Sequence, residues 1–177
     1  MKKILFALIF ALTATVFTEA QMAPSDLDKS PMDATIFRPG RGEAPIVKVI
    51  YSRPQKKNRA VFGNLVPFGK VWRTGANEST ELKVYKEIKF GGQTLSPGTY
   101  SLFSIPNEDT WTVIVNSDTD MWGAYQYNES NDVIRVEVPS QSSSDTVEAF
   151  TILFDKQDET AHLVMAWDDT MVAVPVE

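Results

Sequence analysis

Short segments in which apolar and polar residues alternate recur through residues 46–176, and they constrain the fold more than any other feature. Alternation with a period of two is typical of a strand with one buried face. Turn residues such as Gly91-Gly92 and Pro97-Gly98 separate several segments. We expect strands at residues 46–51, 82–90, 99–105, 111–115, 133–138, 149–154, 162–167 and 171–176.

About eight short strands, with no helical pattern longer than two turns, predict an all-β domain. Two antiparallel sheets packed face to face and a closed barrel both satisfy this pattern. We favour the antiparallel β-sandwich, because no expected strand carries the interior glycines that bend strands at barrel corners. A polar loop at residues 140–146 and a turn at residues 168–170 complete the expected layout.

The first twenty residues have the pattern of an export signal. Lys2 and Lys3 precede an apolar run at residues 4–17, and residues 18–20 resemble a small-residue cleavage site. The run is shorter than the roughly 18 apolar residues that a membrane span needs. We therefore expect a signal peptide at residues 1–20, an extended leader at 21–44 and the β-sandwich domain at 45–177. The mature protein would be periplasmic or extracellular.

The composition excludes several classes of function. The chain has no cysteine, which rules out thiol catalysis and thiolate metal sites. His162 is the one histidine, so a histidine triad or a zinc site with several imidazoles is excluded too, and we expect no metal or cofactor. The formal net charge is −6, whereas nucleic acid needs a concentrated basic face. We expect neither a nucleic-acid partner nor a membrane span.

Residues 59–80 fit neither a helix nor a strand. The segment RAVFGNLVPFGKVWRTGANEST contains three glycines, a Trp-Arg pair and a polar run. An irregular connection of this length in a small domain is usually a binding or active-site loop. We expect it to cover one face or one end of the sandwich. Arg53 and Arg59 flank residues 54–58, which we interpret as a solvated basic turn. The alternative is that Arg59 reaches back to the region of Glu78.

The strongest candidate site within this loop comprises Trp72, Arg73, Asn77 and Glu78. Arg73 is a permanently charged donor, Asn77 offers a donor and an acceptor, and Glu78 accepts or transfers a proton. These groups could hold a ligand with hydroxyl groups or a carboxylate. The structural alternative is that Arg73 pairs with Glu78 to pin the loop while Trp72 fills the core.

A second cluster, MWGAYQY at residues 121–127, places three aromatic side chains around Gly123. Exposed aromatic faces can stack on a sugar ring. Trp122 with Tyr125 or Tyr127, facing the Trp-Arg loop, would complete a ligand pocket. Ordinary packing is the alternative for each aromatic side chain. The fold must bring the two clusters together if they form one site.

Other motifs are excluded by their spacing. The oxygen-bearing residues 116–120 resemble a calcium loop, but the glycine at its sixth position is missing and Tyr127 stands where the bidentate glutamate belongs. Residues 63–70 do not have the spacing of a phosphate-binding loop, and no hydroxyl follows Lys70. We expect an ordinary turn at residues 116–120.

Several segments together resemble a known family of exported bacterial proteins, catalogued as domain of unknown function 2911. They are YSRP (51–54), VFGNLVPFGKVWRTGANE (61–78), GTYSLFSIP (98–106), WTVIVN (111–116) and DVIRVEV (132–138). The resemblance extends over residues 31–176. It implies a single exported β-sandwich domain in bacteria with a two-membrane envelope, and it transfers no catalytic role. Asn58 and Phe68 depart from the family pattern, which has glycine and tyrosine there.

Three functions remain open. The first is a binding module of the envelope for a small polar ligand, plausibly a saccharide or a cell-wall fragment. The second is a carboxylate-dependent hydrolase, with Glu78 as acid or base and a partner among Asp118, Asp120, Glu129 and Asp132. The third is a structural or assembly protein, in which the long loop only closes the sandwich. Burial and mutual bonding of Arg73, Asn77 and Glu78 would favour the third.

Overall fold

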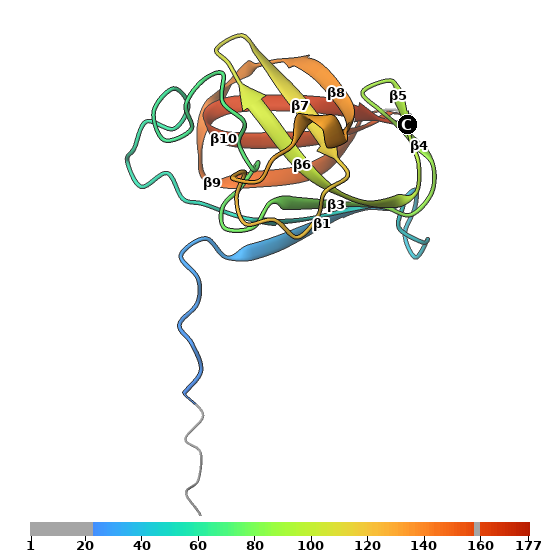
Figure 1. Ribbon diagram of the computed structural model, residues 1–177, viewed down its shortest axis with the longest axis horizontal. Coiled ribbons are helices and arrows are strands. Elements are labelled where there is room, and N and C mark those ends of the chain that lie inside the picture. The colour runs from blue at the N-terminus through green and yellow to red at the C-terminus, as the bar shows by residue number, and fades with distance from the viewer. Residues whose placement is uncertain (1–22, 158–159) are drawn as a thin grey trace, which may run out of the picture.

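The computed structural model describes residues 23–157 and 160–177, and its strands form two antiparallel sheets packed face to face (Figure 1). The first sheet has six strands in the order β1-β2-β3-β6-β7-β8, and the second has four in the order β5-β4-β10-β9. The strands are β1 (Met32–Phe37), β2 (Val47–Ser52), β3 (Thr80–Val84), β4 (Ile88–Phe90), β5 (Gln93–Leu95), β6 (Gly98–Pro106), β7 (Thr110–Asn116), β8 (Asp132–Pro139), β9 (Gln141–Gln157) and β10 (Thr160–Val176). The all-β class and the antiparallel sandwich are confirmed.

The observed strands differ from the expected eight in several places. Residues 93–95 form β5, which was not expected, and the expected strands at 162–167 and 171–176 are one strand, β10. Residues 32–37, within the expected leader, form β1 and pair with β2, and the expected strand at 82–90 is divided between β3 and β4. The predicted loop at 140–146 is wrong except at Ser140, which separates β8 from β9, and the predicted turn at 168–170 is wrong, because β9 and β10 are strands of 17 residues each. Residues 141–146 are polar because β9 is the edge strand of its sheet and most of their side chains are exposed.

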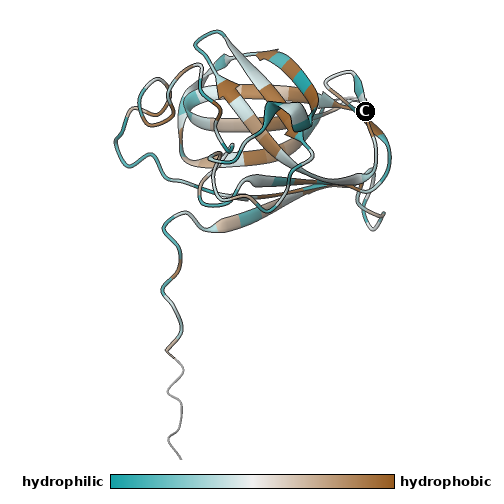
Figure 2. Cartoon of the chain, viewed as in Figure 1, coloured by the Kyte–Doolittle hydropathy of each residue, from teal (hydrophilic) through white to brown (hydrophobic). Residues whose placement is uncertain are grey.

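The main core lies between the sheets, where the strands present alternate side chains to each other. The first sheet contributes among others Val49, Leu82, Leu102 and Val113, and the second contributes Phe90, Phe150, Leu163 and Val174. In Figure 2 the hydrophobic residues concentrate on the strands of both sheets. Burial of these side chains supplies the main stabilisation of a chain without disulfides.

Polar contacts also join the two sheets. The hydroxyl of Tyr51 in β2 accepts a hydrogen bond from the backbone nitrogen of Ile152 in β9 (2.9 Å) and donates one to the carbonyl of the same residue (3.1 Å). Arg53 donates to the Phe150 carbonyl (3.1 Å) and pairs with Asp33 of β1 (3.0 Å). These contacts hold the start of the long loop against β9.

A second, smaller apolar cluster lies on the outer face of the six-stranded sheet. Phe103 of β6 and Ile114 of β7 pack there with Met121 of the β7–β8 connection. That connection, residues 117–131, includes the short 3₁₀ helix Glu129–Asn131 and passes in front of β6 in the view of Figure 1. The connection is thus anchored on the sheet.

The expected signal peptide, residues 1–20, lies outside the described residues. Within the part of the chain that the structure describes, no helix has the length and apolar character needed to cross a bilayer.

Candidate binding site

The long loop between β2 and β3 is anchored at several points. Its first residues pair with β9, through the isolated bridge between Gln55 and Ala149. Further along, the backbone of Trp72 pairs with Ser104 of β6 in both directions, at 2.7 and 2.9 Å. The loop therefore crosses one end of the sandwich and contacts both sheets, so its side chains are held in defined places.

Trp72 is part of the core. Its side chain is 8% exposed and its ring lies within 5.0–6.1 Å of four other aromatic rings. These rings belong to Phe62, Trp111, Phe150 and Trp167. The indole nitrogen donates to the Gly75 carbonyl at 3.0 Å, which closes the turn that follows. Trp72 thus fills the core, as the structural alternative expects, and one edge of it borders the cleft described below.

The turn after Trp72 holds a strained residue. Thr74 has φ of 53°, a left-handed conformation that β-branched residues rarely adopt. Its fully buried hydroxyl lies 2.9 Å from the Ser104 hydroxyl, and its carbonyl accepts a hydrogen bond from the Thr80 hydroxyl at 2.7 Å. Strain of this kind persists only where the surroundings impose it, and it recurs at functional sites. The turn gives Arg73 a fixed backbone position.

The two clusters singled out in the sequence lie side by side. The Asn77 carbonyl accepts a hydrogen bond from the Gly123 nitrogen (3.0 Å), and the Ser79 nitrogen donates to the Met121 carbonyl (2.8 Å). Glu78 and Trp122 form the bridge between these bonds. A short antiparallel pairing therefore joins the Trp-Arg loop to the aromatic segment.

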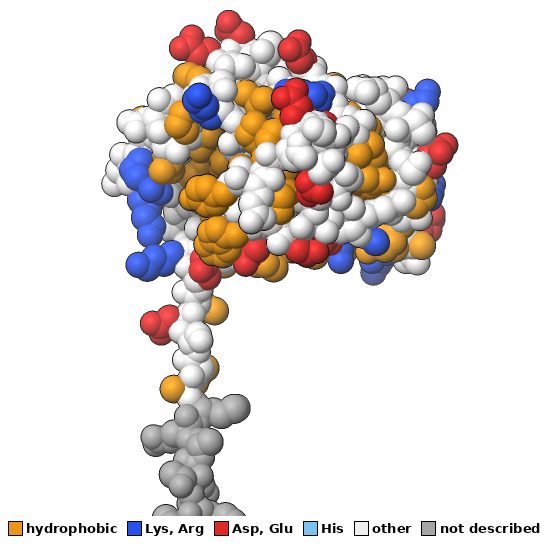
Figure 3. All heavy atoms as spheres, viewed as in Figure 1, with side chains coloured by type: hydrophobic (Ala, Val, Ile, Leu, Met, Phe, Trp, Pro, Cys, Tyr) orange, Lys and Arg blue, Asp and Glu red, His pale blue; other side chains and the backbone are white. Residues whose placement is uncertain are grey.

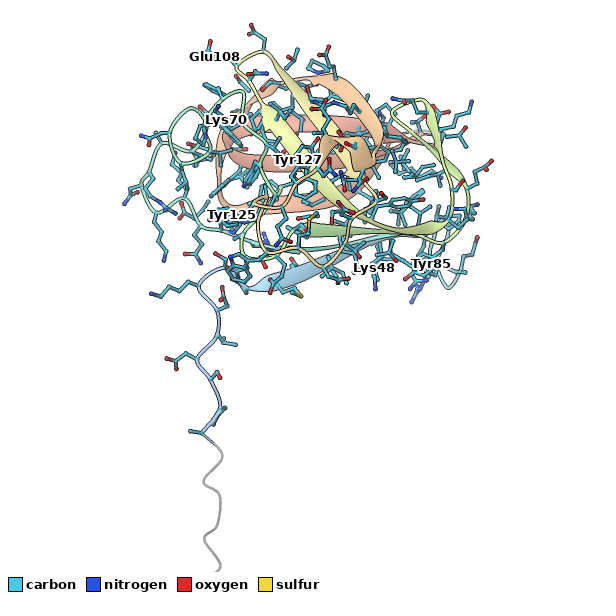
Figure 4. The ribbon with its side chains drawn as sticks, in the orientation of Figure 1. Lys48, Lys70, Tyr85, Glu108, Tyr125 and Tyr127 are labelled. Atoms are coloured by element: carbon cyan, nitrogen blue, oxygen red, sulfur yellow. The ribbon has the colours of Figure 1, made fainter. Side chains whose placement is uncertain are left out.

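Two of the three aromatic side chains in that segment are exposed. Trp122 is 62% exposed and Tyr125 is 84% exposed, and we call this pair the aromatic shelf. Figure 3 shows hydrophobic side chains gathered on this face, next to a group of Lys and Arg side chains. Figure 4 shows Tyr125 on the β7–β8 connection, near the long loop. Large exposed aromatic side chains are available for stacking on a ligand.

Tyr127 serves the fold instead. Its ring packs against Phe103 with the centroids 5.2 Å apart, and its hydroxyl donates to Asp132 at 2.6 Å. Burial, reinforced by the hydrogen bond to the Asp132 carboxylate, raises the pKa of the Tyr127 phenol well above its ordinary value. The phenol is therefore protonated at neutral pH and acts as a donor that fixes the connection. Nothing in this arrangement directs Tyr127 to a ligand.

Arg73 has no partner for its charge among the described residues. The pair with Glu78 that the structural alternative requires does not form, and the buried Nε makes no hydrogen bond. Burial lowers the pKa of the guanidinium, while the nearby Tyr125 phenol acts in the opposite direction. Arginine nevertheless stays charged. A Cβ atom placed on Gly123 would lie 3.7 Å from Nη1 of Arg73. This end of Arg73 therefore lies close to the backbone of the aromatic segment.

Arg73 lines a cavity of about 290 Å³ together with Arg59, and we call this cavity the arginine cleft. Trp72, Trp167, Asn77 and Ser30 contribute to its wall. Arg59 is exposed, in agreement with the expected solvated turn, and its Nε and Nη2 donate to the carbonyls of Lys56 (2.8 Å) and Gln55 (2.5 Å), which holds the turn at the cleft. The signal for Arg59 in the sequence was its position at the start of the irregular segment.

Glu78 faces a different cavity. Its side chain is exposed and lines a space of about 230 Å³ with Glu81 and Asp120, whereas the preceding residue, Asn77, lines the arginine cleft. Asn77 has φ of 58°, a left-handed conformation, and Glu78 then pairs with Trp122. The four loop residues predicted as one site are therefore divided between two cavities and the core.

The other carboxylates proposed as partners of Glu78 have structural contacts. Asp118 accepts a hydrogen bond from the Asn131 amide at 2.7 Å, Glu129 lies 3.5 Å from Arg135, and Asp132 binds Tyr127 and Arg135. Asp120 is the proposed partner that shares a cavity with Glu78. Within residues 23–157 and 160–177, no group of three or more His, Cys, Asp or Glu side chains could hold a metal ion.

We expect replacement of Arg73 with methionine to leave the free energy of unfolding unchanged or to raise it by up to about 1 kcal/mol. The substitution keeps the apolar stem and removes a partly buried charge whose Nε is unpartnered. Thermal unfolding followed by circular dichroism would show a midpoint higher by 0 to about 4 °C. As a contrast, Arg53→Met removes bonds to Asp33, Phe150 and Thr151 and is expected to cost about 2 kcal/mol. A larger loss in Arg73→Met than in Arg53→Met would show that Arg73 holds the loop.

Comparison with known proteins gives one match. The model of a family described as "Protein of unknown function (DUF2911)" matches residues 32–176. The match begins at the first residue of β1 and ends at the last residue of β10, so it covers both sheets and the candidate site. No curated protein and no solved structure matches the chain.

Proposed function

The chain belongs to the DUF2911 family, whose description assigns no activity, and we propose that it is an exported binding module of the bacterial envelope for a small polar ligand, of the saccharide or cell-wall fragment class. The observation that carries the proposal is the pairing of residues 77–79 with residues 121–123. This pairing joins the segment that carries the aromatic shelf to the loop that carries Arg73, whose guanidinium has unused donors and lies near the Tyr125 phenol. Export is supported by the charged and apolar pattern of residues 1–20.

The chemistry of these groups suits a sugar. Aromatic faces contact the apolar face of a sugar ring, while the guanidinium of Arg73 and the amide of Asn77 can bond its oxygens. A purely structural role would favour loop residues that are buried and bonded to each other. Instead, Arg73 makes no hydrogen bond to Asn77 or Glu78 among the described residues, and Glu78 is exposed. These features support binding over a role limited to closing the sandwich.

The test is titration of the purified protein with oligosaccharides, including peptidoglycan fragments, by isothermal calorimetry. We expect Trp122→Ala and Tyr125→Ala each to raise the Kd of any ligand found by about fivefold, which corresponds to about 1 kcal/mol of lost aromatic contact. Tyr85→Ala is the matched control, because Tyr85 is also exposed but lies at the opposite side of the face in Figure 4. Absence of heat with every ligand would contradict the proposal.

Carboxylate-dependent hydrolysis is a second candidate, supported by the shared cavity of Glu78 and Asp120. It is less favoured because the Glu78 side chain is exposed, whereas the general acid of a glycosidase is shielded from water. Analysis of the titrated samples for cleaved saccharide separates the two functions. Cleavage that is lost in Glu78→Gln would assign an enzyme, and intact ligand would leave binding alone.

A further inference from the structure

We propose that the arginine cleft binds the anionic group of a small acidic ligand, and that Arg59 and Arg73 together hold this group. This inference rests on the proposed binding function and specifies the class of ligand. Its first basis is a local excess of positive charge. Two arginines line the cleft, and no aspartate or glutamate is among its lining residues within the described chain. The whole chain carries a formal net charge of −6, so a cleft with this lining departs from the rest of the molecule.

The second basis is the unused hydrogen-bonding capacity of both guanidiniums. Arg59 uses Nε and Nη2 to bond backbone carbonyls, which orients the side chain without neutralising its charge. The Arg73 guanidinium has no ion pair and no hydrogen bond among the described residues, and its Nη1 lies near Gly123 and the Tyr125 phenol. A planar guanidinium binds a carboxylate or a phosphate through two parallel hydrogen bonds. A bound anion would supply the negative charge that neither arginine receives from the described residues.

The size and the lining of the cleft favour a small polar ligand. The volume of about 290 Å³ is at the lower end of the roughly 300–1,000 Å³ typical of small-molecule pockets, so the cleft accommodates a group of sugar size. Asn77 and Ser30 add neutral polar groups to the wall. Asp28 is near the rim, where its Oδ1 accepts hydrogen bonds from the Ser30 nitrogen (2.6 Å) and the Asn77 amide (3.2 Å). These neutral donors leave its negative charge in place, so the two arginines must outweigh one carboxylate at the rim.

Carboxylates and phosphates share this chemistry, and a matched set of probes separates them. N-acetylmuramic acid and N-acetylglucosamine differ by a lactyl ether that carries a carboxylate. Inorganic phosphate supplies an anion without a sugar. Each probe would be titrated at millimolar concentration into the purified protein, with binding followed through the indole N–H signals of the four tryptophans in ¹H–¹⁵N NMR spectra. The Trp72 indole, bonded to the Gly75 carbonyl at the wall of the cleft, is the local reporter.

We expect N-acetylmuramic acid to bind at least tenfold more tightly than N-acetylglucosamine and to lose affinity as salt is raised. Arg73→Met and Arg59→Gln should each weaken this binding by about tenfold or more, because each removes a charge-assisted contact. Arg38→Gln is the matched control, since Arg38 is exposed, bonds a backbone carbonyl in the same way and does not line the cleft. It should change affinity by less than twofold. Thermal unfolding of each variant confirms that the fold is kept.

The outcomes are distinct. Binding of N-acetylmuramic acid that depends on both arginines supports the inference with a sugar carboxylate as the anion. Binding of phosphate with the same dependence supports the anion site and identifies phosphate as a ligand. Equal affinity for N-acetylmuramic acid and N-acetylglucosamine, unchanged in the arginine variants but weakened in Trp122→Ala, would overturn the anion site and leave the proposed function standing. No response to any of the three probes would overturn the anion site.

Discussion

Replacing Trp72 with alanine is expected to lower the free energy of unfolding by about 3–5 kcal/mol, the range for deletion of a buried aromatic side chain. The Trp72 ring lies 5.0 Å from Phe150 and stacks on Trp167 at 6.0 Å, so its removal leaves a cavity that the surrounding rings cannot fill. It also removes the hydrogen bond from the indole nitrogen to the Gly75 carbonyl. Both losses act at the point where the long loop joins the core.

Urea unfolding followed by circular dichroism measures this loss. Trp122→Ala is the matched control, because Trp122 is 62% exposed and its removal is expected to change stability by less than about 0.5 kcal/mol. The pair therefore separates two tryptophans that look alike in the sequence. A loss below about 1 kcal/mol in Trp72→Ala would mean that the loop is not packed into the core as described.

Replacing Asp132 with alanine is expected to cost about 3 kcal/mol. One Asp132 oxygen accepts hydrogen bonds from the Tyr127 hydroxyl (2.6 Å) and from Arg135 (2.7 Å), and the other accepts from the Asn116 amide (2.8 Å). Asn116 is fully buried, and its amide also donates to the Asn128 carbonyl at 3.0 Å, so loss of Asp132 leaves one of its two amide N–H groups without a partner. Arg135 is partly exposed, so solvent screening reduces the contribution of its ion pair with Asp132 to the free energy of unfolding.

The control for this prediction is Glu129→Ala. Glu129 also lies near Arg135, at 3.5 Å, but its side chain is 75% exposed, and its removal should change stability by less than about 0.5 kcal/mol. Chemical denaturation of both variants provides the comparison. Equal effects of the two substitutions would show that the Asp132 hydrogen bonds do not hold the β7–β8 connection. Because that connection carries the aromatic shelf, we also expect Asp132→Ala to broaden the indole signal of Trp122.

Much of the fold was predictable because each strand buries one face, and period-two alternation records that face directly. The errors in the predicted strands occur where the local sequence pattern does not match the position of the segment in the folded protein. Residues 141–146 are polar and are nevertheless strand, since an edge strand needs no buried face there. Asp168 was expected in a turn, but β10 passes through it at a register shift, with φ of 59°. Its ion pair with Lys56 of the long loop supports this bulge.

The candidate site was predictable only in part. Residue types identified Arg73, Asn77, Trp122 and Tyr125 as groups suited to a ligand, and the pairing of residues 77–79 with 121–123 makes them neighbours. No local rule separates Asn77 from Glu78, because the direction of each side chain depends on which strand pairs with the loop. Arg59 was left out of the predicted site for a related reason. Its place in the cleft depends on contacts between the loop and β9, about 90 residues later in the chain.

By itself, the sequence determined the all-β class, the positions of most strands, the lack of thiol chemistry and the two segments that carry unusual polar and aromatic groups. Alternation and composition are local properties, so they can be read from the sequence without knowing which strands pair. Only the tertiary structure decided that Trp72 is buried, that Tyr127 supports the fold and that two arginines line one cleft. Those outcomes depend on hydrogen bonds and packing between segments that are distant in the chain, and local sequence patterns do not reveal these contacts.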